Sequence, residues 1–214
     1  MGVFYVLLSA LFFVLSSVYG KIVTNTTGMS GIITSLGRFL LGTIAMFIYM
    51  IYEKKNFKPA NFKPIFSRAV FNSLTVLLYS IGFQYTTVTN VNMLQMTYPI
   101  FIILLTPYFT KEKIKPSTYI YLTIIMASTF IVVNPKFNSV NIGDVLSLLS
   151  AITSAISIMN LTAARRTDEG YMIVFYVMLL GAIFTLPFSY KDLICFESKG
   201  SLPLFLSSLF GFLG

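Results

Sequence analysis

The sequence predicts an all-α protein that crosses a membrane several times as a bundle of helices. Three observations support this fold class. The mean hydropathy is +0.82, and 56% of the residues are hydrophobic while only 10% are charged. Apolar runs of about 20 residues, each long enough to cross a hydrocarbon core as a helix, recur along the whole chain. These runs are continuously apolar, whereas the strands of a membrane barrel alternate apolar and polar residues, so helices are expected.

Seven complete spans are expected, and an eighth begins near Leu202. Only 13 residues remain from Leu202 onward, and they would form a helix of about 20 Å, which is too short to cross the bilayer. We therefore expect a truncated gene product or a fragment. The first span could alternatively be a secretory signal peptide, although it lacks a basic segment at its start. The seven expected spans are Gly2–Gly20, Gly31–Tyr52, Ala69–Thr86, Val91–Thr110, Ser117–Val133, Gly143–Ala164 and Met172–Tyr190.

The basic residues predict the orientation of these spans. With a cytoplasmic N-terminus, most basic residues outside the spans fall in inside loops, which is the positive-inside pattern of membrane proteins. The net charge of +8 is therefore attributed to topology, and no nucleic-acid partner is expected. We expect a multi-pass protein of the plasma or inner membrane. The inside residues are Lys54, Lys55, Lys58, Lys63, Arg68, Lys111, Lys113, Lys115, Arg165 and Arg166, and the outside residues are Lys21, Lys136, Lys191 and Lys199.

The composition excludes several kinds of chemistry. The chain has no histidine, and Cys195 is its only cysteine, so His or Cys metal clusters, His-based catalytic triads and intrachain disulfides cannot form. No phosphate-binding loop of the GxxxxGK[ST] type occurs. All seven acidic residues lie in expected loops or at the ends of spans, so no carboxylate deep in the membrane is available to carry protons. We expect no cofactor, no metal and no enzymatic activity.

Two short segments recur in the same order. "LLSA" at residues 7–10 returns 141 positions later at residues 148–151, and "FLLGTI" at residues 39–44 returns as "MLLGAI" 139 positions later. A unit that runs from the first span to the fifth contains an odd number of crossings. A second copy would therefore be inverted in the membrane, which is the plan of many secondary transporters.

The segments "SLGRFLLGTI", "LLYSIGFQYTTVTNVNMLQMTYPIFIILLTPYFTKEKIKPS" and "GDVLSLLSAITSAISIMNLTAARR" resemble the EamA group of the drug/metabolite transporter superfamily. The resemblance implies ten helices in two inverted five-helix repeats around a central cavity. Residues 1–134 would then form the first repeat with five helices. Residues 142–214 would form an incomplete second repeat, with two helices and part of a third.

Polar side chains inside the spans are the candidates for lining this cavity. Asn92, Gln95 and Tyr98 follow one another at intervals of three residues on one side of the fourth span. Pro99 has no N–H and cannot bond the carbonyl of Gln95, so this span either breaks locally around a solute or tolerates the proline as membrane helices do. The remaining candidates are Arg38, Asn72, Tyr79, Asn160 and Tyr176.

Arg38 is the one basic residue expected within a span. An arginine at the centre of a membrane helix costs at least ~2.5 kcal/mol on insertion scales, so it should face the bundle interior. Its counterpart 139 positions later is Val177, which makes the two copies unequal here. Arg38 could attract an anionic group of a solute, or it could anchor neighbouring helices through their carbonyl and hydroxyl groups.

These observations and the resemblance together predict a secondary, non-ATP transporter of small organic metabolites that exports them by alternating access. The expected partners are the lipid bilayer and a small-molecule solute, with a homodimer or a partner half as a further alternative. The alternative function is that of a non-transporting membrane fragment or subunit that needs a partner half. A membrane-embedded enzyme is disfavoured because the chain lacks histidine and buried carboxylates.

Overall fold

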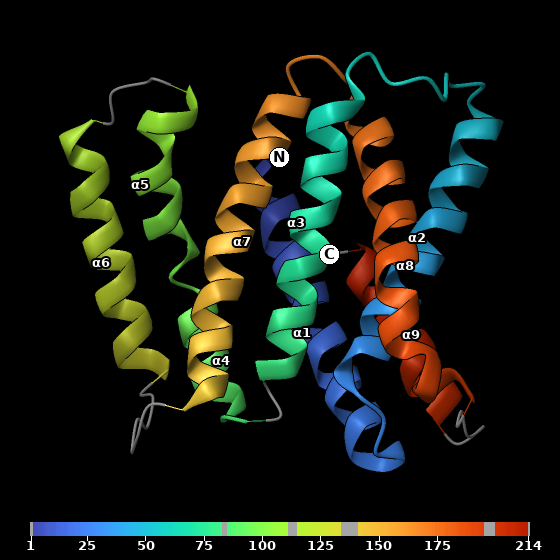
Figure 1. Cartoon of the computed structure of the whole chain (residues 1–214), viewed down its shortest axis with the longest axis horizontal. Helices are drawn as coiled ribbons and strands as arrows, with labels where there is room; N and C mark the ends of the chain where they lie inside the picture. Colours follow the sequence, from blue (N-terminus) through green and yellow to red (C-terminus); the bar gives the residue numbers. More distant parts are fainter. Residues whose placement is uncertain (1, 83–84, 111–114, 134–140, 195–199, 214) are drawn as a thin grey trace. The chain divides into compact units, whose positions relative to one another are not determined.

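The computed structural model describes residues 2–82, 85–110, 115–133, 141–194 and 200–213. These residues fold into nine helices and no strands, which confirms the all-α class that the sequence predicts (Figure 1). The chain divides into two units, unit 1 with residues 1–60 and 168–214 and unit 2 with residues 61–167. The helices are α1 (Gly2–Thr27), α2 (Gly31–Tyr52), α3 (Phe62–Gly82), α4 (Val88–Gln95), α5 (Tyr98–Thr110), α6 (Pro116–Val133), α7 (Ile142–Ala164), α8 (Gly170–Ile194) and α9 (Ser201–Leu213).

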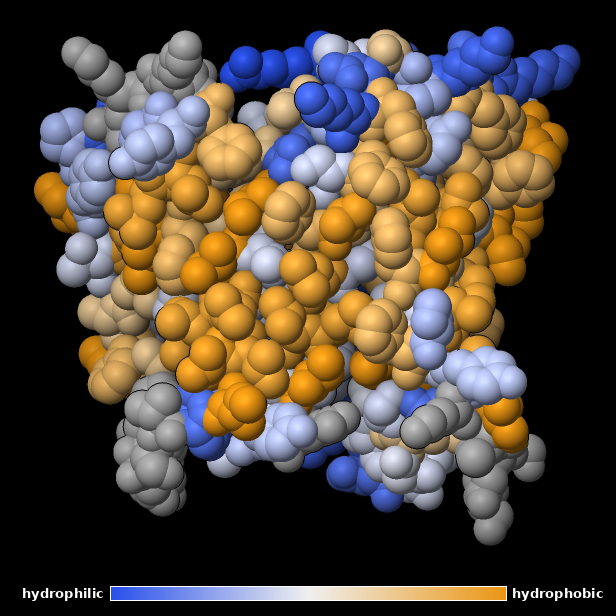
Figure 2. Space-filling model, viewed as in Figure 1, coloured by the Kyte–Doolittle hydropathy of each residue, from blue (hydrophilic) through white to orange (hydrophobic). Residues whose placement is uncertain are grey.

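Five of these helices are long and apolar enough to cross a membrane, namely α1, α2, α3, α7 and α8. Many of their large hydrophobic side chains are exposed, for example Ile48 at 60% and Phe188 at 58%. Figure 2 shows that hydrophobic side chains cover the middle of the visible face and that hydrophilic ones gather toward the helix ends. In water such a surface would promote aggregation, whereas in a bilayer it meets lipid. The chain is a multi-pass membrane protein.

Several helix bounds differ from the predicted spans because polar residues extend the helices beyond the apolar runs. The first helix continues past Gly20 to Thr27, where the hydroxyl of Thr27 donates to the carbonyl of Val23 at 2.7 Å. It ends at Gly28, whose φ of +68° suits glycine at a helix C-terminus. The third helix begins at Phe62 rather than Ala69, since the side chain of Asn61 accepts from the N–H of Lys63 at 3.3 Å and caps its first turn.

In unit 1, α2 and α8 pack through two glycines. A Cβ added to Gly42 of α2 would lie 3.0 Å from Sδ of Met178, and one added to Gly181 of α8 would lie 2.9 Å from the ring of Phe39. Small residues let membrane helices approach closely. The two contacts are reciprocal. Gly42 faces Met178, which is three positions before Gly181, and Gly181 faces Phe39, which is three positions before Gly42. They involve the two segments that recur in the sequence.

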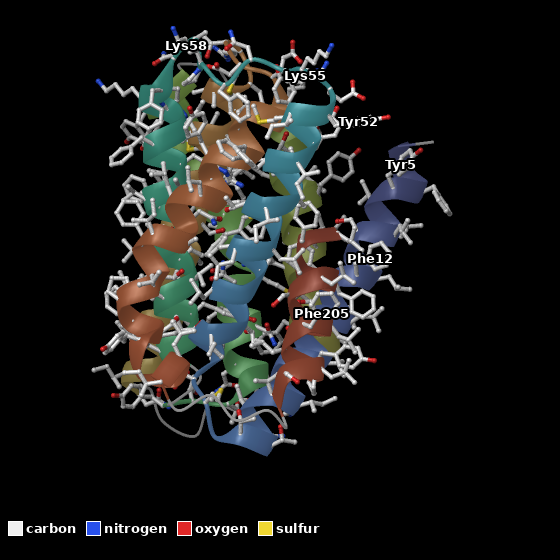
Figure 3. All side chains as sticks on the ribbon, turned by 90° about the vertical axis from the view of Figure 1, so that its right-hand side faces the viewer. Tyr5, Phe12, Tyr52, Lys55, Lys58 and Phe205 are labelled. Atoms are coloured by element: carbon white, nitrogen blue, oxygen red, sulfur yellow. The ribbon has the colours of Figure 1, made fainter. Side chains whose placement is uncertain are left out.

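Also in unit 1, α1 and α9 pack side by side and present Phe12 and Phe205 (Figure 3). The hydroxyl of Ser16 donates to the carbonyl of Ser207 at 2.7 Å, and the hydroxyl of Ser207 donates to the carbonyl of Ser16 at 2.9 Å. The ring of Phe12 stacks on that of Phe210 with the centroids 6.0 Å apart. Interhelical hydroxyl bonds of this kind contribute about 0.6 kcal/mol each in membranes.

The segment that follows α2 is tied to the start of α8. The carboxylate of Asp168 accepts from the N–H of Ala60 at 2.6 Å, and the hydroxyl of Tyr176 donates to the carbonyl of Phe57 at 2.7 Å. The ammonium of Lys55 lies 5.6 Å from the centroid of the Tyr171 ring. The chain leaves unit 1 after Ala60 and returns to it at Asp168. The hydrogen bond between Ala60 and Asp168 therefore links the two points at which the chain passes between the units.

In unit 2, α3 and α7 are antiparallel neighbours, with α4 and α5 against α7 (Figure 1). Their backbones come close at one end, where a Cβ added to Gly143 would lie 2.9 Å from the carbonyl oxygen of Gly82. Glycine is required on α7 for this approach. Most large side chains of α6 remain exposed, including Ile131 at 76%.

Candidate functional site

The fourth predicted span is two helices rather than one. It is interrupted at Met96 and Thr97, between α4 and α5. The N–H of Met96 still bonds the carbonyl of Asn92 at 2.9 Å, but the N–H of Thr97 bonds that of Leu94 at 3.1 Å, which tightens the last turn. Pro99 then lies in the first turn of α5, where a missing N–H costs nothing. The local break expected as one of two alternatives is therefore present, and its role in binding a solute stays a prediction.

The break brings two amide side chains of α4 against hydroxyl groups of neighbouring helices. The hydroxyl of Tyr79 on α3 donates to Oδ1 of Asn92 at 2.5 Å. The hydroxyl of Ser150 on α7 donates to Oε1 of Gln95. Three helices of unit 2 thus meet through polar side chains. Tyr79 and Asn92, which were predicted as separate candidates on different spans, are in direct contact.

Ser150 of α7 is not among the candidate residues that the sequence predicts. The signal was present, because the serines recur on one face of that helix. A serine between two helices can pack and also donate a hydrogen bond, and only the structure identifies its partner. Thr75 and Thr153 form a further bond of this kind at 2.8 Å between α3 and α7.

Arg68 is a second correction, since it was assigned to an inside loop. It lies in α3, where it is half-buried. One guanidinium nitrogen donates to the hydroxyl of Ser157 on α7 at 2.9 Å, and that hydroxyl donates to the carbonyl of Arg68 at 3.1 Å. The error arose because the apolar run begins at Ala69, whereas the helix begins six residues before Arg68.

At the other end of α7, Asp144 is buried and belongs to a capping box. Its N–H bonds the side chain of Asn141, and its carboxylate accepts from the N–H of Asn141, both at 3.1 Å. The carboxylate also accepts from the hydroxyl of Thr86 at 2.8 Å. Three hydrogen bonds therefore hold this acid at a helix start, where negative charge is favourable.

The other predicted residues of unit 2 are more dispersed. Asn72 and Tyr98 are half-buried, and no hydrogen bond of either side chain is found within the described part of the chain. The amide of Asn160 donates to the carbonyl of Ile156, one turn earlier in the same helix, at 2.9 Å. Asn160 is ten residues from Ser150, or about 15 Å along α7, so it is not part of the Asn92 and Gln95 cluster.

The two predicted residues of unit 1 have different surroundings. The guanidinium carbon of Arg38 lies 5.4 Å from the centroid of the Phe39 ring and 5.9 Å from that of Phe13. A Cβ on Gly211 of α9 would lie 2.7 Å from Cδ of Arg38, so the stem of the arginine packs against that glycine. Tyr176 holds the segment after α2 through the carbonyl of Phe57.

Within the residues described, no group of three His, Cys, Asp or Glu side chains could hold a metal ion. The arrangement offers hydroxyl, amide and guanidinium groups, which bind polar or anionic molecules. Cys195 and Glu112 lie outside the described residues, as do residues 134–140 of the junction between the repeats, which the sequence predicts at residues 134–143.

Comparisons with known proteins give relatives that are all named as transporters. The chain is 24% identical over 161 residues to the pseudopaline exporter CntI of Pseudomonas aeruginosa, covering 73% of this chain and 56% of the exporter. It is 24% identical over 196 residues to solute carrier family 35 member G1 of Mus musculus, covering 85% and 52%. An uncharacterized transporter of Helicobacter pylori is 23% identical over 188 residues, covering 85% and 63%.

The chain therefore spans between about half and two thirds of the length of these relatives. The EamA-like transporter family matches residues 1–134, which is more than half of the chain and the whole of the expected first repeat. The membrane-spanning helices of the chain and the polar contacts between its helices agree with this match. The chain belongs to the EamA-like transporter family.

Proposed function

We propose that the protein is a secondary carrier that exports a small organic solute by alternating access without hydrolysing ATP. The observation that carries this proposal is the broken segment α4–α5 with its two amides held by hydroxyl groups. Broken helices at substrate sites are a recurring device of secondary transporters, because the break exposes polar groups within the membrane.

The solute in this proposal is rich in hydrogen-bond acceptors. The two amide oxygens already accept from Tyr79 and Ser150, so the amide nitrogens of Asn92 and Gln95 remain to donate to a solute. These two residues are three positions apart and therefore lie on one face of α4. A carboxylate is the simplest group to accept from both. The name of the Pseudomonas relative makes pseudopaline the first solute to test.

The same proposal includes two inverted repeats, residues 1–134 and 142–214. Two sets of contacts support it. Adding 139 to Phe39 gives Met178, and subtracting 139 from Gly181 gives Gly42, so the contact of Phe39 with Gly181 becomes that of Met178 with Gly42. This is the reciprocal contact that a two-fold axis requires of α2 and α8. Adding 141 converts Ser16 into Ser157, and subtracting 139 converts Ser207 into Arg68. In both pairs the serine hydroxyl donates to the partner's carbonyl.

Orientation and location complete the proposal. The ends of α2 and α7 and the start of α3 carry most of the described basic residues. This distribution supports a cytoplasmic N-terminus in a plasma or inner membrane. Figure 3 shows Lys55 and Lys58 beyond Tyr52, the last residue of α2, at the end of unit 1 that this proposal assigns to the cytoplasm.

Efflux from intact cells tests the function. Cells that express the full product of the gene are loaded with pseudopaline, and its appearance outside is followed with time. We expect saturable efflux that falls by about tenfold or more in Asn92→Ala and Gln95→Ala, since each change removes a polar contact from the site. Asn25→Ala, a change at an exposed position near the end of α1, should have no effect.

The outcomes separate the proposal from its alternative. No efflux above that of empty cells, with the protein present in the membrane, would favour a subunit that needs a partner half. Efflux that is equal in the wild type and in both amide variants would remove the proposed site but not the carrier function.

A further inference from the structure

Unit 2 contains a hollow that is separate from the amide cluster. It lies between the end of α5 and the end of α7, and its wall is apolar on one part and polar on another. It is about 15 Å along α7 from Ser150, since Asn160 is ten residues further on. The hollow is lined by Phe109, Met159, Asn160, Thr162, Ala163 and Arg166.

The hollow lies at the depth where the spans end. Phe109 is the next-to-last residue of α5, and Ala163 is the next-to-last residue of α7. Thr162, Ala163 and Arg166 are exposed, and Phe109 is 55% exposed. The wall thus combines apolar side chains with the polar groups of Asn160 and Arg166 near the boundary between hydrocarbon and headgroups. A phospholipid changes from acyl chain to phosphate at the same depth.

The charge at this end of unit 2 is strongly positive. The N-terminal part of α3 carries Lys63 and Arg68, and Arg165 and Arg166 directly follow α7. Among the described residues of unit 2, Asp144 is the one acidic residue, and it lies at the opposite end of α7. Asp168 and Glu169 of unit 1 follow in the chain, and the carboxylate of Asp168 accepts from the N–H of Ala60. Basic pockets between membrane helices on the cytoplasmic side bind anionic lipid headgroups.

We propose that this hollow binds one anionic phospholipid. Arg166 contacts the phosphate, because a guanidinium matches phosphate oxygens with two parallel donors. Asn160 adds a donor, since only one of its two amide hydrogens is needed for the carbonyl of Ile156. The acyl chain lies along Phe109, Met159 and Ala163. The apolar wall favours a lipid over free phosphate as the occupant.

Thermal unfolding of the purified chain in detergent tests this site without any transport assay. Dioleoyl-phosphatidylglycerol should raise the unfolding temperature more than dioleoyl-phosphatidylcholine, and inorganic phosphate should not reproduce the effect. In Arg166→Gln the apparent affinity for phosphatidylglycerol should fall by about tenfold or more, the effect of losing a hydrogen bond to a charged group.

Arg165→Gln is the matched control, because it removes the same charge from the neighbouring residue, which does not line the hollow. It should weaken binding by at most about fivefold, the general effect of one basic side chain near an anionic surface. Ala163→Phe, which fills the hollow and leaves the charge unchanged, should also weaken binding. Equal losses in the two arginine variants, or an unaltered affinity in Ala163→Phe, would overturn the proposal, as would equal stabilisation by phosphatidylcholine or by phosphate.

Discussion

At the scale of single residues, two arginines lie within membrane helices and use different partners. Arg38 lies near two aromatic rings and packs its stem against Gly211. Arg68 bonds Ser157 on the neighbouring helix. A cation near an aromatic face gains about 0.5 to 2 kcal/mol, depending on how far it is removed from water. The arginines therefore contribute to packing as well as to any interaction with solute.

The substitution Arg38→Lys separates these two contributions. Lysine keeps the charge but lacks the planar group that can stack on rings and bind a carboxylate with two donors. We expect the variant to fold, with a loss of at most about 1 kcal/mol, and to show reduced efflux. Thermal unfolding and efflux of the same preparations provide the check. Lower stability with unchanged efflux would leave Arg38 a structural role only.

At the scale of helices, glycines and hydroxyl groups set the contacts. The sequence predicted the lengths of α2 and α7 well, because the length of an apolar run matches the thickness of the hydrocarbon core that the helix crosses. It left the break after Gln95 as one of two alternatives, and it did not predict the start of α3 before Arg68 or the bond from Ser150 to Gln95. These features depend on which polar groups meet across helices, and a single helix pattern does not contain that information.

The close packing of α2 on α8 predicts a cost for enlarging its glycines. Gly181→Ala places a methyl group 2.9 Å from the ring of Phe39, and overpacking of this kind costs about 1 to 3 kcal/mol. Denaturation in mixed micelles measures the change. Gly31→Ala is the control, since nothing lies within 4 Å of an added Cβ at that position. A loss of stability in Gly31→Ala as large as that in Gly181→Ala would contradict the packing described.

The bond from Ala60 to Asp168 predicts a local effect at the two connections between the units. Asp168→Ala removes the acceptor of the Ala60 N–H, and a net loss of about 1 kcal/mol should speed hydrogen exchange across residues 55–60 by about fivefold. Asp168→Asn keeps an acceptor oxygen and should change exchange little. Glu169→Ala, an adjacent change of the same charge, should have no effect. Exchange that is equally fast in all three variants would exclude a specific role for Asp168.

At the scale of the whole molecule, the sequence predicted the repeat from two short matches at offsets of 139 and 141. The same two offsets relate pairs of contacts in the structure. An offset of 139 relates the two glycine contacts between α2 and α8. Offsets of 141 and 139 relate the serine contact between α1 and α9 to the one between α7 and α3. Short matches in leucine-rich sequence are weak evidence of ancestry. Contacts that transform into one another under the same offsets are much harder to obtain by chance, and they are the main support for two copies.

The central claim is that these copies are inverted, and the labelling of two equivalent threonines tests it most directly. Thr26 and Thr167 are exposed and 141 positions apart, and five crossings separate them when α4 and α5 count as one. Thr26→Cys and Thr167→Cys are made separately in a Cys195→Ala background, and cells are treated with a membrane-impermeant maleimide. If the copies are inverted and the N-terminus is cytoplasmic, Thr26→Cys is labelled in intact cells and Thr167→Cys only after permeabilisation. Labelling of both from the same side of the membrane would contradict the inverted repeat.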